Sequence, residues 1–103
     1  MNNIKFAFHP GEFIKDEIDS RGWTQKQFAN IIGKSLTEVN ELINGKRNIT
    51  SNWAILIAAA FDVEPETFLN MQSRYDCYKE QQNFSESKIK DIRNNAKKLK
   101  IVA

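Results

Sequence analysis

Apolar residues recur at helical spacing along most of this chain of 103 residues. The two best-marked sets are Phe28, Ala29 and Ile32, followed by Val39, Leu42 and Ile43. Gly33 stands between them, and glycine readily adopts the left-handed conformation that ends a helix. The pattern therefore predicts two short helices joined by a tight turn within residues 24–44.

Polar residues support the same interpretation. Thr24 and Ser35 precede the two helices, where a hydroxyl can cap free backbone amides. The face of the second helix opposite its apolar side carries Leu36, Thr37, Glu38, Asn40, Glu41 and Asn44. Outward residues near the start of such a helix are those that contact base edges in helix-turn-helix proteins. A plain helical hairpin is the alternative, because it needs the same caps and apolar faces.

Further helices are predicted on either side of this pair. One begins at Pro10 and ends near Gly22, a second follows Thr50 and reaches Phe61, and a third runs from Pro65 to about Gln81. The alternating residues 4–8 predict a short edge strand or an extended arm. The fold class is therefore all-α with five helices.

The C-terminal part differs in charge from the rest. Residues 1–82 hold nine Lys and Arg against eleven Asp and Glu, whereas residues 83–103 hold six against two. We therefore divide the chain into a helix-turn-helix domain, residues 1–82, and a basic tail, residues 83–103. Ile89, Ile92, Ala96 and Leu99 recur at helical spacing, so the tail is either a sixth helix or disordered. An acidic domain should bind DNA weakly alone and depend on pairing or on the tail.

Catalysis, metal binding and cofactor binding have no support in the sequence. The single histidine, His9, fits a loop or capping role, and Cys77 fits a buried or half-buried structural thiol without a neighbouring base. Gly45 and Lys46 lack the flanking residues of a nucleotide-binding loop. One cysteine and no long apolar run favour a reducing cytoplasm over a membrane.

Three aromatic residues share one stretch of the fifth helix: Phe68, Tyr75 and Tyr78. They have two interpretations, as core residues or as a homodimer interface, and tyrosine is favoured at interfaces. Two-fold pairing would place two recognition helices roughly 34 Å apart, one turn of DNA.

Four segments carry a resemblance to a known family: H-P-G-E from His9, T-Q-K-Q-F-A from Thr24, I-N-G-K-R-N-I-T from Ile43 and F-L-N-M-Q-S-R-Y-D from Phe68. Together they resemble the short HigA-type antitoxins, also called virulence-associated protein I, of the Cro/cI-like (XRE) helix-turn-helix group. The resemblance implies a lambda-repressor-like domain that dimerises, represses transcription at operator DNA and neutralises a HigB-type, RelE-like mRNA endonuclease toxin.

The resemblance also implies roles for individual residues. The phosphate-binding residues would be Gln25, Asn44, Lys46 and Arg47, and the base-reading residues Leu36, Thr37, Asn40 and Glu41. Leu36, Glu38 and Lys34 depart from the family pattern. Leu36 would contact a thymine methyl group, and Glu38 is unfavourable near phosphates unless it accepts a hydrogen bond from cytosine.

The toxin-binding face follows from charge alone. A toxin that binds RNA should be basic, so the acidic residues of the first helix, Glu12, Asp16, Glu17 and Asp19, are the candidate surface. Two alternatives remain: a stand-alone phage-type repressor without a toxin, and a protein-interaction module that has lost operator binding.

Overall fold

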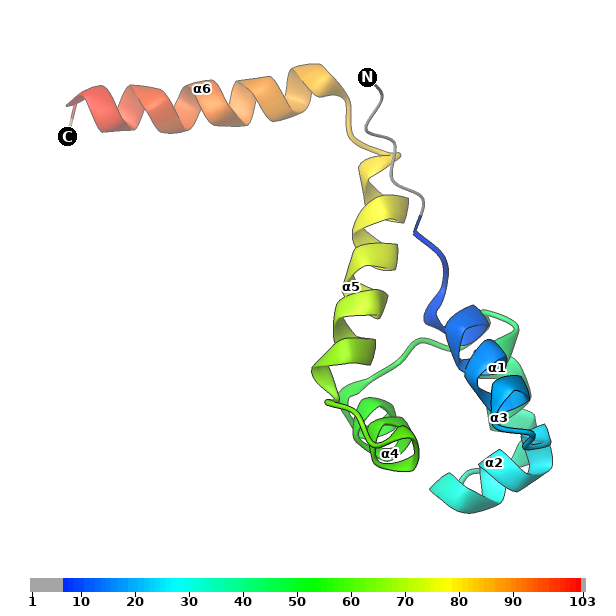
Figure 1. The fold of residues 1–103 in the computed structure, drawn as a ribbon. Coiled ribbons are helices and arrows are strands. Elements are labelled where there is room, and N and C mark those ends of the chain that lie inside the picture. The colour runs from blue at the N-terminus through cyan, green and yellow to red at the C-terminus, as the bar shows by residue number, and fades with distance from the viewer. Residues whose placement is uncertain (1–6, 103) are drawn as a thin grey trace.

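The computed structural model describes residues 7–102, which form six helices and no strand (Figure 1). In chain order these are α1 Pro10–Ser20, α2 Gln25–Ile32, α3 Leu36–Ile43, α4 Ser51–Phe61, α5 Glu66–Gln81 and α6 Glu86–Val102. The all-α prediction is confirmed, and the C-terminal sixth helix is formed. The strand or arm predicted at residues 4–8 lies mostly outside the described residues. None of the described helices is long and apolar enough to cross a membrane.

One core joins α1 to α5. Its buried side chains are Ile14, Ile18, Phe28, Ala29, Ile32, Val39, Leu42, Ile43, Ile49, Trp53, Ala54, Ile57, Ala58, Phe61 and Phe68. Both apolar sets that predicted the helix pair are among them, so the faces assigned to α2 and α3 are confirmed. Because these side chains are buried, the outward face of α3 is fixed by packing rather than by local preference.

The entry to α1 is held by an unusual cap. His9 is buried, and its Nδ1 atom accepts a hydrogen bond of 2.9 Å from the backbone N–H of Gly11. The ring also contacts Tyr75 edge-on, with 5.1 Å between centroids. The capping role predicted for His9 is confirmed. Directly after this cap, Gly11 lies where α1 crosses α3, and a Cβ atom there would collide with the backbone carbonyl of Leu42.

A buried amide ties α5 to the loop between α3 and α4. The Gln72 side chain accepts a hydrogen bond of 2.8 Å from the N–H of Ile49 and donates to Asn48 at 3.2 Å and to Asp76 at 2.9 Å. Both donors and the acceptor oxygen of this amide are therefore satisfied, and the loop that follows α3 is anchored.

We expect Gln72→Leu to lower the free energy of unfolding by about 1–3 kcal/mol, because the buried N–H of Ile49 loses its acceptor. Urea denaturation followed by circular dichroism measures this loss. Asn70→Leu, at an exposed position of the same helix, is the matched control and should change stability by less than about 0.5 kcal/mol. Equal stability of Gln72→Leu and Asn70→Leu would contradict the anchoring role.

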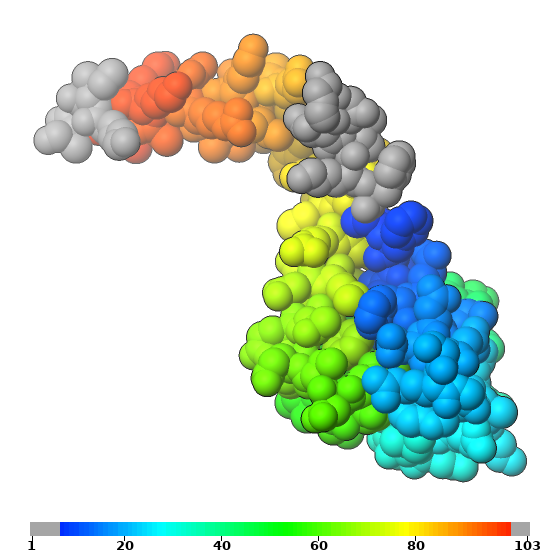
Figure 2. Space-filling model, in the orientation of Figure 1, coloured from blue at the N-terminus to red at the C-terminus, as the bar shows by residue number. Residues whose placement is uncertain are grey.

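The sixth helix projects away from the domain (Figure 1, Figure 2). Every side chain from Gln81 to Leu99 is exposed, and the described molecule measures 59 × 29 × 24 Å. A short linker, residues 82–85, separates α6 from α5. The helix therefore takes no part in the core.

Candidate nucleic-acid interface

The α2–α3 pair is capped at both starts and broken by one glycine. The Thr24 hydroxyl accepts a hydrogen bond from the N–H of Gln27, whose side chain accepts one from the N–H of Thr24. Gly33 ends α2 with φ of +74°. Each feature is local in sequence: the caps fix where α2 and α3 begin, and the glycine fixes where α2 ends.

The exposed face of α3 is polar near its start and at its centre. Thr37, Asn40 and Asn44 are exposed, and Leu36 at the first position is 48% exposed. The opposite face is buried in the core. The structure thus leaves exposed Leu36, Thr37 and Asn40, which the family resemblance implies as base-reading residues, with Glu41 half-buried at the edge.

A chain of side-chain amides crosses this face. Asn44 Nδ2 donates to the Asn40 backbone oxygen at 2.9 Å and to the Asn40 side-chain oxygen at 3.1 Å. Asn40 Nδ2 in turn donates to Gln25 Oε1 on α2, at a long 3.5 Å. Asn40 is therefore oriented from both sides, while its long bond to Gln25 is weak and leaves the amide group available to another partner.

Glu38 does not point out as a base-reading side chain. Its carboxylate accepts hydrogen bonds from the N–H and the hydroxyl of Ser35, at 3.1 and 3.0 Å, and so completes the cap of α3. The hydrogen bond from the Ser35 backbone, followed by that from its hydroxyl, lowers the pKa of Glu38. Glu38 is therefore held as an anion at the start of α3, where the helix dipole favours negative charge.

The two cationic residues after α3, Lys46 and Arg47, differ in whether they form an ion pair. Arg47 Nη2 donates to Glu41 Oε1 at 2.8 Å, and the guanidinium lies 5.7 Å from the centre of the Trp53 ring. Its Nε atom is buried and has no hydrogen-bond partner among the described residues. Lys46 is exposed and forms no ion pair within residues 7–99. Lys46 is thus the freer candidate for a phosphate contact, and Glu41 and Arg47 form one unit.

Lys34 is a functional candidate that the sequence analysis did not assign. Its ammonium group lies 5.0 Å from the centre of the Trp53 ring, on the same indole as Arg47. The Trp53 ring therefore makes cation–π contacts with both Lys34 and Arg47. The sequence signal was the position of Lys34, directly after the turn glycine and before the cap of α3.

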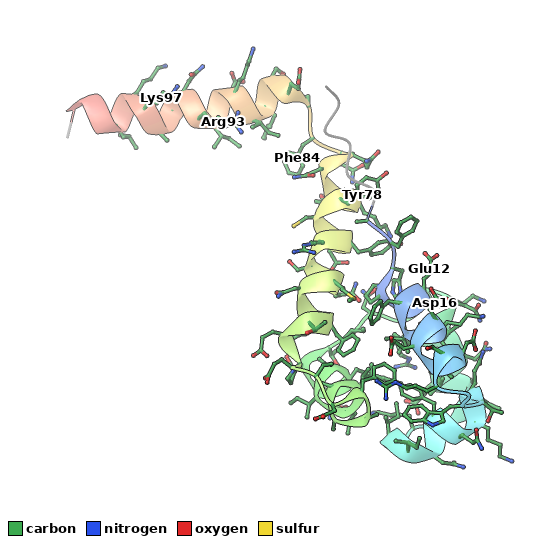
Figure 3. The ribbon with its side chains drawn as sticks, in the orientation of Figure 1. Glu12, Asp16, Tyr78, Phe84, Arg93 and Lys97 are labelled. Atoms are coloured by element: carbon green, nitrogen blue, oxygen red, sulfur yellow. The ribbon has the colours of Figure 1, made fainter. Side chains whose placement is uncertain are left out.

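The remaining predicted site residues are not equivalent in the structure. Among the α1 acids, Glu17 pairs with Arg21 at 3.3 Å and Asp19 with Lys15 at 3.1 Å. Glu12 and Asp16 form no ion pair with a described residue, and both line one groove together with Tyr78 of α5. Figure 3 shows the two acids on α1 and Tyr78 toward the end of α5. The predicted acidic surface is therefore divided into two paired and two free carboxylates.

Two expectations are corrected. Phe68 is fully buried, in contact with the rings of Phe13 and Phe61, so it is a core residue and cannot contribute to a dimer surface. Tyr75 and Tyr78 are half-buried and keep exposed area. Cys77 is exposed rather than buried or half-buried, because its position on α5 lines an open groove beside α1 instead of the core.

Comparison with known proteins adds a family model. The model "Helix-turn-helix" (HTH_3) matches residues 14–68, from α1 to the start of α5. Virulence-associated protein I of Dichelobacter nodosus is 31% identical over 71 residues, which cover 68% of this chain. The chain spans 66% of the length of that relative and 60% of a second curated relative.

Solved structures share the same arrangement of helices. An addiction module antidote protein of a HigA family from Coxiella burnetii is 30% identical, with a TM-score of 0.75 over 84% of this chain and 95% of that chain. The antitoxin HigA of Pseudomonas aeruginosa, solved with the higBA promoter, is 25% identical, with a TM-score of 0.72 over 76% of this chain and 86% of that chain.

Proposed function

Since this chain belongs to the XRE-type helix-turn-helix family, among the antitoxins of HigA type, we propose that it binds operator DNA as a homodimer and represses its own operon. The observation that carries the proposal is the exposed amide and hydroxyl face of α3, fixed by a buried apolar face behind it. Two such helices related by a two-fold axis would read two half-sites.

Phosphate contacts would come from the rim of this face. We assign them to exposed Lys46, to Gln25 at the start of α2, to Asn44, and to Arg47 once its bond to Glu41 is exchanged. Lys34 is an addition to this set. Because residues 1–82 are acidic overall, the affinity of one domain should be low, and pairing supplies the second set of contacts.

The proposal is tested by fluorescence anisotropy on labelled DNA from the promoter upstream of the gene. We expect specific binding with two chains per site, at least about 100-fold tighter than on scrambled DNA of equal length. Equal binding to both DNAs at low salt would refute it and favour the interaction module without operator binding.

We further propose a toxin as the protein partner. The support is the family and the antidote proteins that this chain resembles, together with the acidic side of α1. The product of the adjacent open reading frame is the candidate, and a short basic protein is expected there. An unrelated neighbouring gene would instead favour the stand-alone repressor.

The toxin proposal predicts that replacing Glu12, Asp16, Glu17 and Asp19 with serine weakens association with the toxin at least tenfold, because a basic partner loses its complementary charges. Titration calorimetry of the purified pair measures the change. Replacing the exposed α5 residues Asn70 and Ser73 with alanine is the control. Undiminished association of the four-serine variant would remove α1 from the interface.

A further inference from the structure

The sixth helix is amphipathic, and its side chains from Glu86 to Leu99 are not covered by any other described part of the chain. Ile89, Ile92 and Leu99 are 36%, 54% and 69% exposed, and their spacing places them on one face with Ala96. Arg93 and Lys97, one turn apart, flank this apolar stripe on one side (Figure 3). Most of the stability of a helix in a protein comes from packing of its apolar face, so this helix of 17 residues would gain stability from a partner.

A groove of about 920 Å³ lies between the start of α1 and the second half of α5. Apolar side chains line much of it, among them Phe8, Phe13, Met71 and Tyr78. Phe8 and Phe13 are 68% and 42% exposed, which is unusual for phenylalanine in a monomer. The carboxylates of Glu12 and Asp16, one turn apart on α1 and in no ion pair with a described residue, belong to the same lining, with Arg74 on the α5 side.

We propose that α6 of a second copy docks in this groove, and that the exchange is reciprocal. The apolar stripe of α6 would cover Phe13, Met71 and Tyr78. Arg93 and Lys97 would then face Glu12 and Asp16, since both pairs have the same spacing of four residues along a helix. The inference rests on the homodimer of the proposed function and names the surfaces that build it. It assigns Glu12 and Asp16 to the homodimer, which leaves Glu17 and Asp19 of the α1 acids for the toxin.

A second copy is favoured over the helix's own groove by the linker. The turn is held by backbone hydrogen bonds from Asn83 to Glu80 at 2.9 Å and from Phe84 to Gln81 at 3.2 Å. Ser85 caps α6, its hydroxyl accepting from the N–H of Lys88 at 3.1 Å. These bonds point α6 away from the groove of its own chain (Figure 1, Figure 2). Folding back would break them, whereas docking on a second copy leaves them intact.

Operator DNA is a weaker candidate for the apolar stripe. Phosphates would bind the lysines of α6 but would leave Ile89, Ile92 and Leu99 in water. A protein groove with an apolar floor and carboxylates can bind both the apolar stripe and the basic side chains of α6. The occupant must therefore offer both chemistries, as the α1–α5 groove does.

The single cysteine provides a direct test, because Cys77 is exposed and lines the groove. Unaltered full-length protein, carrying a size tag, is mixed with the untagged double variant Cys77→Ser/Ile92→Cys and oxidised mildly. We expect a disulfide-linked dimer of mixed size on non-reducing gels. The matched control Cys77→Ser/Asn94→Cys, with its thiol on the opposite face of α6, should give at least fivefold less.

The outcomes separate the alternatives. No mixed dimer above the Asn94 control overturns the inference. Oxidation of Ile92→Cys with Cys77 retained, giving an internally linked monomer instead of a dimer, also overturns it in favour of the chain's own groove. If linking fails while two chains still bind each operator, the homodimer of the proposed function stands and only this interface is lost.

Reversing charges provides an independent test. Arg93→Glu/Lys97→Glu and Glu12→Lys/Asp16→Lys should each raise the dimer dissociation constant at least tenfold, as measured by analytical ultracentrifugation. Mixing the two variants should restore dimer formation, because in the mixed dimer the basic groove meets the acidic α6 and the unaltered acidic groove meets the unaltered basic α6. Failure of the mixture to recover would contradict the proposed pairing of these residues.

Discussion

Replacing Thr37 and Asn40 together with alanine is expected to reduce specific operator affinity by about 2–4 kcal/mol, or roughly 30- to 1,000-fold. Both side chains are exposed on α3 and support no buried contact. The fold should therefore survive while the reading of bases is lost. This is the largest functional effect that the structure predicts for a change without loss of stability.

The size of the effect follows from how Asn40 is held. An asparagine can bond an adenine through both of its amide atoms, and such a pair discriminates by about 1–3 kcal/mol. Here the amide is already oriented by Asn44 at 3.1 Å and restrained weakly by Gln25. Little side-chain freedom remains to be lost on binding, so most of the contact energy should contribute to affinity.

Anisotropy on promoter DNA and on scrambled DNA measures the loss. Lys46→Ala is the informative contrast, since loss of a phosphate contact should weaken binding on every sequence and reduce the salt slope by about 1. Asn70→Ala, an exposed amide on α5, is the control of matched chemistry and should change nothing. If Thr37→Ala/Asn40→Ala weakened binding to both DNAs equally, α3 would not be the reading helix.

The helix pair could be predicted from sequence because its signals are local. Thr24, Ser35 and Gly33 act within one or two turns of their own position, so caps and turn are readable without a structure. The buried faces followed from spacing for the same reason. Base-reading and phosphate roles came from resemblance, and they stay predictions until DNA binding is measured.

The other features of the site and of the core depend on contacts between segments that are distant in the sequence. Arg47 forms an ion pair with Glu41 beside Trp53, so it is less available for a phosphate contact than Lys46. The spacing of these residues in the sequence does not predict this ion pair. Glu38 could have been assigned from sequence, because serine followed three residues later by glutamate is the capping-box pattern. The burial of Phe68 could not be predicted from sequence, since only the packing of α5 against α1 decides which aromatic residue faces the core.

Gly11→Ala is the change for which sequence and structure predict opposite signs. Inside a helix, alanine is about 1 kcal/mol more favourable than glycine, so sequence alone predicts stabilisation. In the structure a Cβ at this position would collide with the backbone carbonyl of Leu42 on α3. Backbone cannot rotate away as a side chain can, so α1 and α3 would have to separate. We expect a loss of about 3 kcal/mol in the free energy of unfolding.

Thermal and urea unfolding measure the loss, and Gly22→Ala is the control. Gly22 has φ of +74°, but apart from its two chain neighbours no described residue has an atom within 4 Å of the position that a Cβ would take, so alanine there meets backbone strain of about 1–2 kcal/mol without a clash. Because α1 packs directly on α3, Gly11→Ala should also weaken operator binding, whereas Gly22→Ala should leave it unchanged once folded. A neutral or stabilising Gly11→Ala would mean that α1 and α3 are not in backbone contact, and the orientation assigned to the reading helix would then be wrong.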